Sequence, residues 1–302
     1  MHFEEIVSGL RFPEGPIALP GGEVVLVEIE RGTLSRVTPS GVIEVIAELG
    51  GGPNGAAIGP DGRCYVCNNG GFEWIRLETM LLPGDQPAGY SGGRIEAVDL
   101  GTGKSEVLYT ECDGHGLRGP NDIVFDRQGG FYFTDLGKTR ERDQDRGGVY
   151  YAKIDGSLIR EVVYPANTPN GVSLSPDEKT LYVAETVTGR LFAYDIGEPG
   201  VVERKYPPLE CLAGVGGYQF FDSMTVDSEG HACVATLING GVTRISPDGQ
   251  RVEHFATDDP LTTNVCFGGE DLRTAYVTLS SSGRLVKGTW PVPGLPLNFL
   301  NV

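Results

Sequence analysis

The sequence predicts an all-β protein, a six-bladed β-propeller whose four-stranded antiparallel blades surround a central channel. Three observations carry this prediction: a repeated opening motif, the hairpin pattern that follows each motif, and an abundance of turn residues. The chain of 302 residues contains 45 glycines and 20 prolines, as many tight turns require. No long segment keeps apolar residues at uninterrupted helical spacing.

Each predicted blade opens on a short motif that carries one acidic or amide side chain. The six openings are Phe12-Pro13-Glu14-Gly15-Pro16, Pro53-Asn54-Gly55, Pro120-Asn121-Asp122, Pro169-Asn170-Gly171, Phe221-Asp222-Ser223 and Thr263-Asn264-Val265. The intervals between the polar residues range from 40 residues (Glu14 to Asn54) to 67 residues (Asn54 to Asn121). Blades of repeat proteins span about 40 to 50 residues, so we expect inserted loops in the long interval. Because six such units fill the chain, we expect residues 1–302 to form a single propeller domain.

A β-hairpin follows the openings. After Asn121 come the apolar residues 123–125, a turn at 127–130 and the β-rich segment 131–134, and residues 170–184 repeat this order. A second pair of strands usually follows, as at 148–152 and 189–195. Residues 72–82 lie in an insertion of the second unit, and we predict a loop or a turn of helix there.

Charge and cysteine content narrow the classes of function. A formal net charge of −17 argues against a nucleic-acid partner, which needs clustered Lys and Arg. The N-terminus does not resemble a signal peptide, and no apolar stretch is long enough to cross a bilayer, so we expect a cytoplasmic protein. We also expect a monomer or weak dimer that acts on a small molecule. Cys64 and Cys67 are three apart on a predicted strand, and we interpret them as buried thiols rather than a metal or redox pair.

The candidate site lies where the six openings meet. The first strand of every propeller blade lines the channel, so six oxygen-bearing side chains should converge: Glu14, Asn54, Asn121, Asn170, Asp222 and Asn264. Two buried carboxylates repel each other unless one is protonated or a cation is present. Oxygen-only ligands favour Ca²⁺, then Mg²⁺ or Mn²⁺, while Zn²⁺ more often recruits His or Cys. The alternative is that the Asn residues only cap strands, but this alternative does not explain why Glu14 and Asp222 replace Asn in two of the openings.

The same motifs resemble the senescence-marker-protein/gluconolactonase family of six-bladed propellers, which includes regucalcin-like lactonases. The matching segments are residues 11–16, 119–126, 133–135, 169–177, 222–227 and 263–269. The resemblance implies a divalent metal at the channel mouth, with Glu14, Asn170 and Asp222 as ligands and Asn121 as a further ligand or a substrate contact. The chain departs from the family pattern in Phe221-Asp222-Ser223-Met224, where many lactonases have Pro-Asp-Gly-Met, and at Leu136, which replaces the usual Pro.

We therefore predict a divalent-metal-dependent hydrolase that opens a small lactone such as an aldonolactone. The metal would polarise the carbonyl, and Asp222, or else Glu14, would orient or deprotonate the attacking water. Three alternatives remain open: a phosphotriesterase, because diisopropyl-fluorophosphatase-like propellers use a similar ligand set; a lyase on the same scaffold; and a non-catalytic calcium-binding propeller. A serine hydrolase is disfavoured because the sequence has no G-x-S-x-G motif.

Further substrate contacts are predicted from the inserted loops and the remaining amides. The candidates are Asn54, Asn264, Arg118, His115 and Trp74. A structural role is an equal alternative for Arg118 and His115, and packing of the insertion is the alternative for Trp74. The dense mixed-charge segment 138–146 is interpreted as a solvated hairpin tip.

Overall fold

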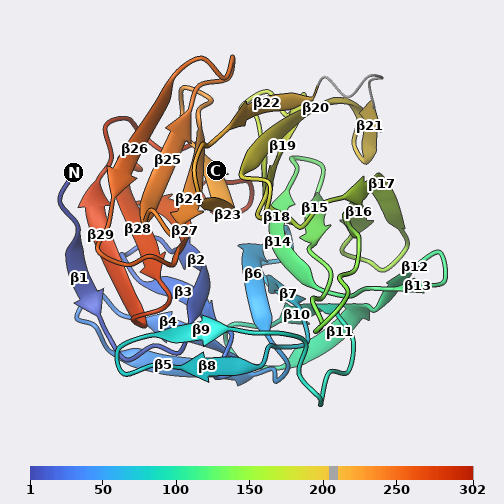
Figure 1. Ribbon diagram of the computed structural model, residues 1–302, viewed down its shortest axis with the longest axis horizontal. Helices are drawn as coiled ribbons and strands as arrows, with labels where there is room; N and C mark the ends of the chain where they lie inside the picture. Colours follow the sequence, from blue (N-terminus) through green and yellow to red (C-terminus); the bar gives the residue numbers. More distant parts are fainter. Residues whose placement is uncertain (204–209, 302) are drawn as a thin grey trace.

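Six antiparallel sheets stand around a central axis (Figure 1). The structure is a computed structural model that describes residues 1–203 and 210–301, and these residues contain strands β1 to β29 and no α-helix. The predicted six-bladed β-propeller is confirmed. In the same residues no helix is long and apolar enough to cross a lipid bilayer.

The first three blades follow the chain from the inside outward. Blade 1 consists of β2 (Pro13–Ala18), β3 (Val24–Glu28), β4 (Thr33–Val37) and β5 (Ile43–Glu48). Blade 2 consists of β6 (Pro53–Ile58), β7 (Cys64–Asn68), β10 (Arg94–Val98) and β11 (Ser105–Tyr109). Blade 3 consists of β14 (Pro120–Phe125), β15 (Gly130–Asp135), β16 (Gly147–Lys153) and β17 (Ile159–Ala166).

The remaining blades use the second half of the chain. Blade 4 consists of β18 (Pro169–Leu174), β19 (Thr180–Glu185), β20 (Arg190–Glu198) and β21 (Val201–Glu203), and β22 (Cys211–Gly214) also pairs with β20. Blade 5 consists of β23 (Phe220–Val226), β24 (Ala232–Leu237), β25 (Gly241–Ile245) and β26 (Val252–Ala256). Blade 6 consists of β27 (Thr262–Gly268), β28 (Thr274–Leu279), β29 (Arg284–Thr289) and the N-terminal strand β1 (Glu4–Val7).

Blade 6 closes the ring because it combines both ends of the chain. The strand β1 pairs antiparallel with β29, with Glu4 opposite Lys287 and Glu5 opposite Val286. This pairing satisfies the backbone groups of the outer edge of β29 and ties the first strand to the last blade. The six openings in the sequence locate the inner strands but do not indicate this pairing.

The long interval between the second and third openings holds two small hairpins, as the blade spacing predicted. The first is β8 (Trp74–Arg76) paired with β9 (Leu81–Pro83), and the second is β12 (Glu111–Cys112) paired with β13 (His115–Gly116). The prediction of a loop or helical turn at 72–82 is therefore wrong. The segment forms a hairpin whose Leu81 N–H donates to the Ser281 carbonyl of blade 6 (2.8 Å), so contacts distant in sequence decide its conformation.

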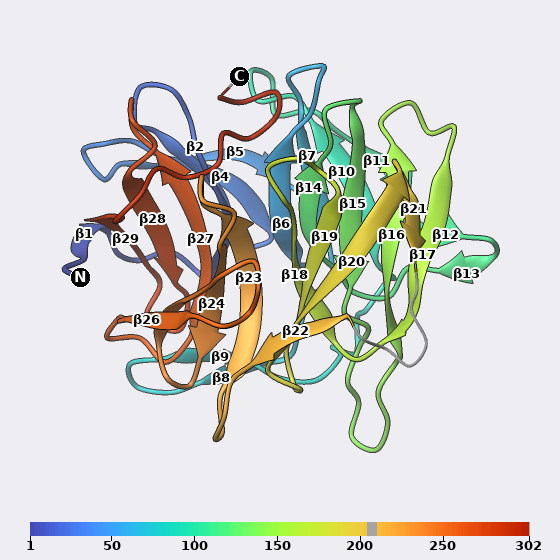
Figure 2. The same cartoon turned by 90° about the horizontal axis from the view of Figure 1, so that it is seen from above.

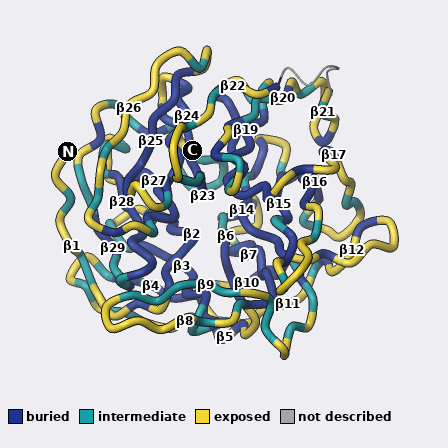
Figure 3. Tube along the Cα trace, viewed as in Figure 1, coloured by how far each residue is buried: buried dark blue, intermediate teal, exposed yellow. Residues whose placement is uncertain are grey.

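The hydrophobic core lies between neighbouring blades (Figure 3), where the inner strands are buried and the outer edges exposed. One cluster joins Tyr65 and Cys67 of blade 2 to Phe131 and Phe133 of blade 3, whereas Cys64 points to the opposite face and packs against blade 1. Both thiols are buried and free, as predicted. Each sheet thus buries both faces, which a blade can do only with its neighbours present.

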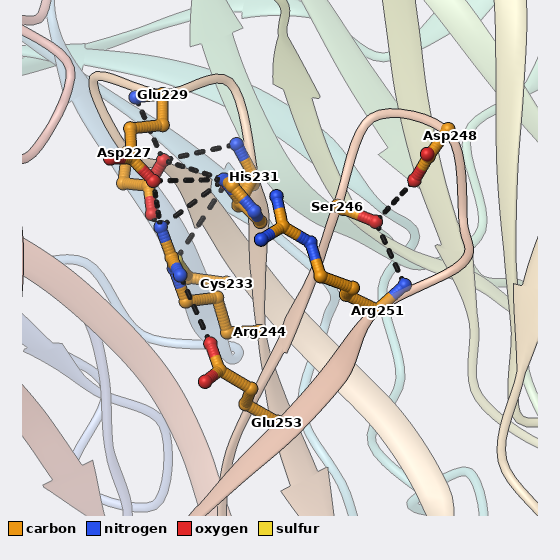
Figure 4. A network of polar contacts seen from close by, with 9 residues as sticks. All are labelled: Asp227, Glu229, His231, Cys233, Arg244, Ser246, Asp248, Arg251 and Glu253. Atoms are coloured by element: carbon orange, nitrogen blue, oxygen red, sulfur yellow. Dashed lines mark hydrogen bonds and ion pairs between the residues drawn. The ribbon is translucent and has the colours of Figure 1, made fainter.

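A buried ion-pair network fastens the turn between β23 and β24 to the outer strands of blade 5 (Figure 4). Arg244 donates to the carboxylates of Asp227 (2.7 Å), Glu229 (2.7 Å) and Glu253 (3.0 Å). Its guanidinium also lies 3.2 Å from His231 Nδ1, and because a guanidinium only donates, this nitrogen accepts. Asp227 is fully buried, so Arg244 balances a charge that water cannot reach.

Replacement of Arg244 by Met should therefore destabilise the protein. The change leaves the Asp227 carboxylate buried without its counter-ion, a loss expected to cost about 3–5 kcal/mol. Urea unfolding followed by fluorescence measures the difference from the wild type. The matched control is Arg251→Met in the same blade, an exposed side chain whose removal should change stability by less than about 0.5 kcal/mol. Similar losses in the two variants would contradict this account.

Candidate functional site

The structure brings the six polar residues of the openings together around the channel. The inner strands β2, β6, β14, β18, β23 and β27 contact one another in a closed ring. Each of the six side chains sits near the start of its strand and is at most 8% exposed; the six are Glu14, Asn54, Asn121, Asn170, Asp222 and Asn264. We call this set the oxygen ring.

Glycine after the polar residue makes this convergence possible. A Cβ atom on Gly55 would lie 2.3 Å from the Asn121 carbonyl oxygen, and one on Gly171 would lie 2.6 Å from the Asp222 carbonyl oxygen. Such distances are too short for any side chain, so glycine is required at these two contacts between neighbouring blades.

Two of the ring side chains are carboxyls whose pKa is raised by burial. Glu14 Oε2 accepts hydrogen bonds from the Gly15 N–H (2.7 Å) and from Asn264 Nδ2 (2.8 Å). Burial raises the pKa of Glu14 to about 7, and the hydrogen bonds from Asn264, Gly15 and Thr263 only partly oppose it. Burial, and after it the negative charge of Glu14, raises the pKa of Asp222 well above its usual range. The two carboxyls therefore compete for one negative charge unless a cation is bound.

The amides of the oxygen ring add neutral oxygen atoms. Asn170 Nδ2 donates to Thr186 Oγ1 (3.0 Å), which orients Oδ1 toward Ser223 Oγ of the neighbouring blade (3.4 Å). Asn121 Oδ1 is buried and has no hydrogen-bond partner among the residues that the structure describes. A buried acceptor without a donor costs free energy, and such an atom is suited to a ligand that brings positive charge.

The residues present thus fit a hard divalent cation. Glu14, Asp222, Asn121 and Asn170 would supply oxygen ligands only, which is the donor set of Ca²⁺ or Mg²⁺. Among residues 1–203 and 210–301 no cluster of three or more His, Cys, Asp or Glu side chains is arranged to hold a metal, so two of the ligands would have to be amides.

Asp122 is a third buried carboxyl in the channel, and sequence reasoning missed it. Its carboxylate accepts the N–H groups of Ile123 (3.0 Å) and Val172 (3.1 Å), which links blades 3 and 4. Burial raises the pKa of Asp122 to about 7, opposed by the Val172 hydrogen bond and reinforced by the charge of Glu14. The sequence did contain one signal that could have identified Asp122, because this residue stands where three other openings have glycine.

The two ends of the channel differ. Below the oxygen ring lies a cavity of about 70 Å³, bounded on the far side by Leu297, Asn298 and Leu300. Its volume suffices for a few water molecules. Asn298 Nδ2 donates to the Phe125 carbonyl (3.1 Å) and to Glu178 (2.7 Å), which fixes the C-terminal segment across this end. The β8–β9 hairpin lies at the opposite end (Figure 2).

Loops tied together by a buried lysine surround that opposite end. Lys138 is 1% exposed, donates to the Gly71 carbonyl (2.6 Å) and Asn69 Oδ1 (3.3 Å), and lies 4.2 Å from the centre of the Phe72 ring. Burial lowers its pKa to about 7, against the charges of Asp135 and Asp145. The interpretation of 138–146 as a solvated tip is wrong at Lys138. Its exposed, charged neighbours in sequence gave no sign of this burial.

Three predicted substrate contacts lie outside the oxygen ring. The Trp74 ring packs 5.1 Å from the Phe12 ring and 6.0 Å from the Phe72 ring, in keeping with a packing role for the hairpin. Arg118 and His115 line a separate cleft of about 420 Å³, and no residue of the oxygen ring lines it. We call it the blade 3 cleft; its other lining residues are Gly114, Gly116, Asp135, Asp145, Arg146, Tyr150, Glu161 and Tyr164.

Comparison with known proteins gives consistent matches. The profile of the family described as SMP-30/Gluconolactonase/LRE-like region matches residues 12–281. A lactonase drp35 from Staphylococcus saprophyticus is 31% identical over 223 residues, which are 73% of this chain and 62% of the relative. A gluconolactonase from Zymomonas mobilis is 25% identical over 307 residues, covering 92% of this chain and 78% of the relative. The chain thus spans less than two thirds of the staphylococcal protein.

Solved structures share the fold. A gluconolactonase from Xanthomonas campestris superposes with a TM-score of 0.75 at 22% identity, covering 96% of this chain and 89% of the other. A regucalcin from Agrobacterium tumefaciens, described as a calcium-binding protein, has a TM-score of 0.76 at 18% identity and covers 98% and 99%.

The pKa of Glu14 predicts how stability depends on pH in the metal-stripped protein. The unfolded chain loses this proton near the ordinary value of 4.5, whereas the folded chain keeps it up to about 7. Between these values the folded state binds more protons, so the free energy of unfolding should fall as pH rises from 5 to 8, by at most about 3 kcal/mol from this group.

Urea unfolding of metal-stripped protein at pH 5, 6, 7 and 8 measures this slope. Glu14→Gln removes one of the three buried carboxyls with a raised pKa and should make the slope shallower, while Glu141→Gln, which changes an exposed side chain, should leave it as in the wild type. An unchanged slope in Glu14→Gln would contradict the raised pKa.

Proposed function

The chain belongs to the SMP-30/gluconolactonase/LRE-like family, and from this premise we propose that it hydrolyses a small lactone at the oxygen ring with the help of a bound divalent cation. The relatives named lactonase and gluconolactonase support lactone hydrolysis. The site assignment rests on one observation. Two buried carboxyls lie in the same ring as a buried amide oxygen, Asn121 Oδ1, that has no hydrogen-bond partner among the described residues.

The proposed cofactor is Ca²⁺, held by Glu14, Asn121, Asn170 and Asp222. A bound cation would polarise the lactone carbonyl and stabilise the negative charge that develops as water adds. The oxygen donor set supports Ca²⁺ over Zn²⁺, and the calcium-binding regucalcin shares the fold. Mg²⁺ and Mn²⁺ use similar ligands and belong in the same test.

Asp222 is the proposed general base. Ser223 N–H donates to Asp222 Oδ1 (3.1 Å), which leaves Oδ2 to take a proton from the attacking water. As the water oxygen bonds to the carbonyl carbon and the ring C–O bond breaks, the same proton passes to the leaving alkoxide, and the products are an acid and an alcohol. Burial and the charge of Glu14 raise the pKa of Asp222, so its ionised form is a stronger base than an exposed aspartate.

In this scheme Glu14 is a ligand of the cation. Its Oε2 is occupied by the Gly15 N–H and the Asn264 amide, which orient the carboxylate toward the centre of the ring. Substrate would enter from the end that carries the β8–β9 hairpin, because the segment containing Leu297, Asn298 and Leu300 bounds the cavity at the other end. Asn54 and Asn264 are the ring amides proposed to contact the substrate.

Turnover of a panel of aldonolactones tests this proposal. Metal-stripped protein should be inactive and should regain activity with Ca²⁺, Mg²⁺ or Mn²⁺, as followed by acid release with a pH indicator. Asp222→Asn should lower kcat by about 10²- to 10⁴-fold, while Asp248→Asn, an exposed aspartate in a turn of blade 5, should retain full activity.

Elemental analysis of the bound metal separates the two roles of Asp222. A variant that keeps one metal per chain but loses turnover supports the base, and one that loses both identifies Asp222 mainly as a ligand. Absence of turnover with every lactone, in protein that binds metal stoichiometrically, would refute the lactonase and direct the assays to phosphotriesters.

A further inference from the structure

The blade 3 cleft has free basic groups in a strongly acidic protein. Arg118 and Arg146 both line it. Within residues 1–203 and 210–301 neither guanidinium forms an ion pair, although the chain carries 41 acidic residues against 24 Lys and Arg, and the Arg118 side chain interacts with the Tyr90 hydroxyl. Several other arginines pair with carboxylates, as Arg140 and Arg244 do. Two unpaired arginines in one cleft therefore need an explanation.

Two of the three carboxylates in the cleft bond to donors other than the Arg118 and Arg146 side chains. The Asp135 carboxylate accepts the backbone N–H groups of Arg118 (2.7 Å), Gly119 (2.6 Å) and Gly137 (2.9 Å). Asp145 is paired with the Arg140 guanidinium through both carboxylate oxygens (2.8 and 3.1 Å) and accepts the Lys138 N–H.

Glu161 remains as the third carboxylate, and it accepts the Tyr150 hydroxyl at 3.5 Å. One loosely engaged carboxylate thus remains in the cleft beside two guanidinium groups that form no ion pair. His115 and Tyr164 also line the cleft, and no hydrogen bond of the described residues uses their side chains. They add two further groups able to donate to an oxygen atom.

We propose that the blade 3 cleft binds a small organic anion through a carboxylate or phosphate group, with Arg118 and Arg146 as the recognising cations. Guanidinium groups bind both kinds of oxyanion through paired N–H donors. The volume of about 420 Å³ is within the range of small-molecule sites. His115 and Gly116 of β13 line the cleft, and the β12–β13 hairpin lies beside blade 3, where β12 contacts β17 (Figure 1).

This site is separate from the oxygen ring and does not rest on the proposed lactonase activity. The backbone of Arg118 is fixed by Asp135 at the start of β14, while its side chain lies in the blade 3 cleft with Tyr150 and Glu161 of β16 and β17. Binding should therefore survive removal of metal and should also occur in Glu14→Gln.

Histidine NMR provides the test, because the chain has only four histidines. Metal-stripped protein, dialysed free of chelator, is titrated with inorganic phosphate and in a second series with succinate, at constant ionic strength and pH. The Cε1–H signal of His115, identified by its loss in His115→Gln, should shift and saturate, while the signals of His231 and His254 stay in place. Saturation with one anion and not the other would identify the group that is recognised.

Arginine variants show whether the cleft is responsible. Arg118→Ala and Arg146→Ala should each raise the apparent Kd at least tenfold. Arg142→Ala is the matched control, since Arg142 is exposed on the same loop as Arg146 but does not line the cleft, and its Kd should equal that of the wild type. Failure of both anions to saturate the His115 shift, or an equal loss in Arg142→Ala, would overturn the proposal.

Discussion

At three of the six openings, the inner strands of neighbouring blades pass so close to one another that glycine is required at the contact. A Cβ atom at Gly15, Gly55 or Gly171 would come within 2.3–2.6 Å of the next strand's backbone oxygen. This close packing places one oxygen-bearing side chain per blade in a single ring. Burial of Glu14 and Asp222 in that ring raises the pKa of both carboxyls, and a shared proton or a bound cation would relieve the repulsion between them.

The same packing gives the channel two different ends. The C-terminal segment, held by Asn298, covers the cavity beneath the ring, whereas the β8–β9 hairpin and the loop around Lys138 lie at the other end (Figure 2). The pairing of β1 with β29 closes the ring of blades from outside, because it joins the start of the chain to the last blade.

Positive charge is scarce in this chain and is used in two ways. Arg244 and Lys138 are buried, and each joins segments that the backbone alone would leave apart: Arg244 links the turn at Asp227 to β26, and Lys138 links two loops near the channel. Arg118 and Arg146, by contrast, are exposed and line a shared cleft without forming an ion pair in the described part of the chain. Their shared position in one cleft makes these guanidinium groups available to a ligand.

Sequence alone determined the number of blades and the members of the oxygen ring. Both follow from a local pattern: an opening motif repeated six times, followed by strand-length segments and turns, whose meaning is fixed by β-sheet geometry. Only the tertiary structure decided the pairing of Glu4 with Lys287, the hairpin at 74–83, the burial of Asp122 and Lys138, and the location of Arg118 and His115 in a second cleft. These features depend on contacts between residues far apart in the chain and on the exclusion of water, and neither leaves a periodic signal in the sequence.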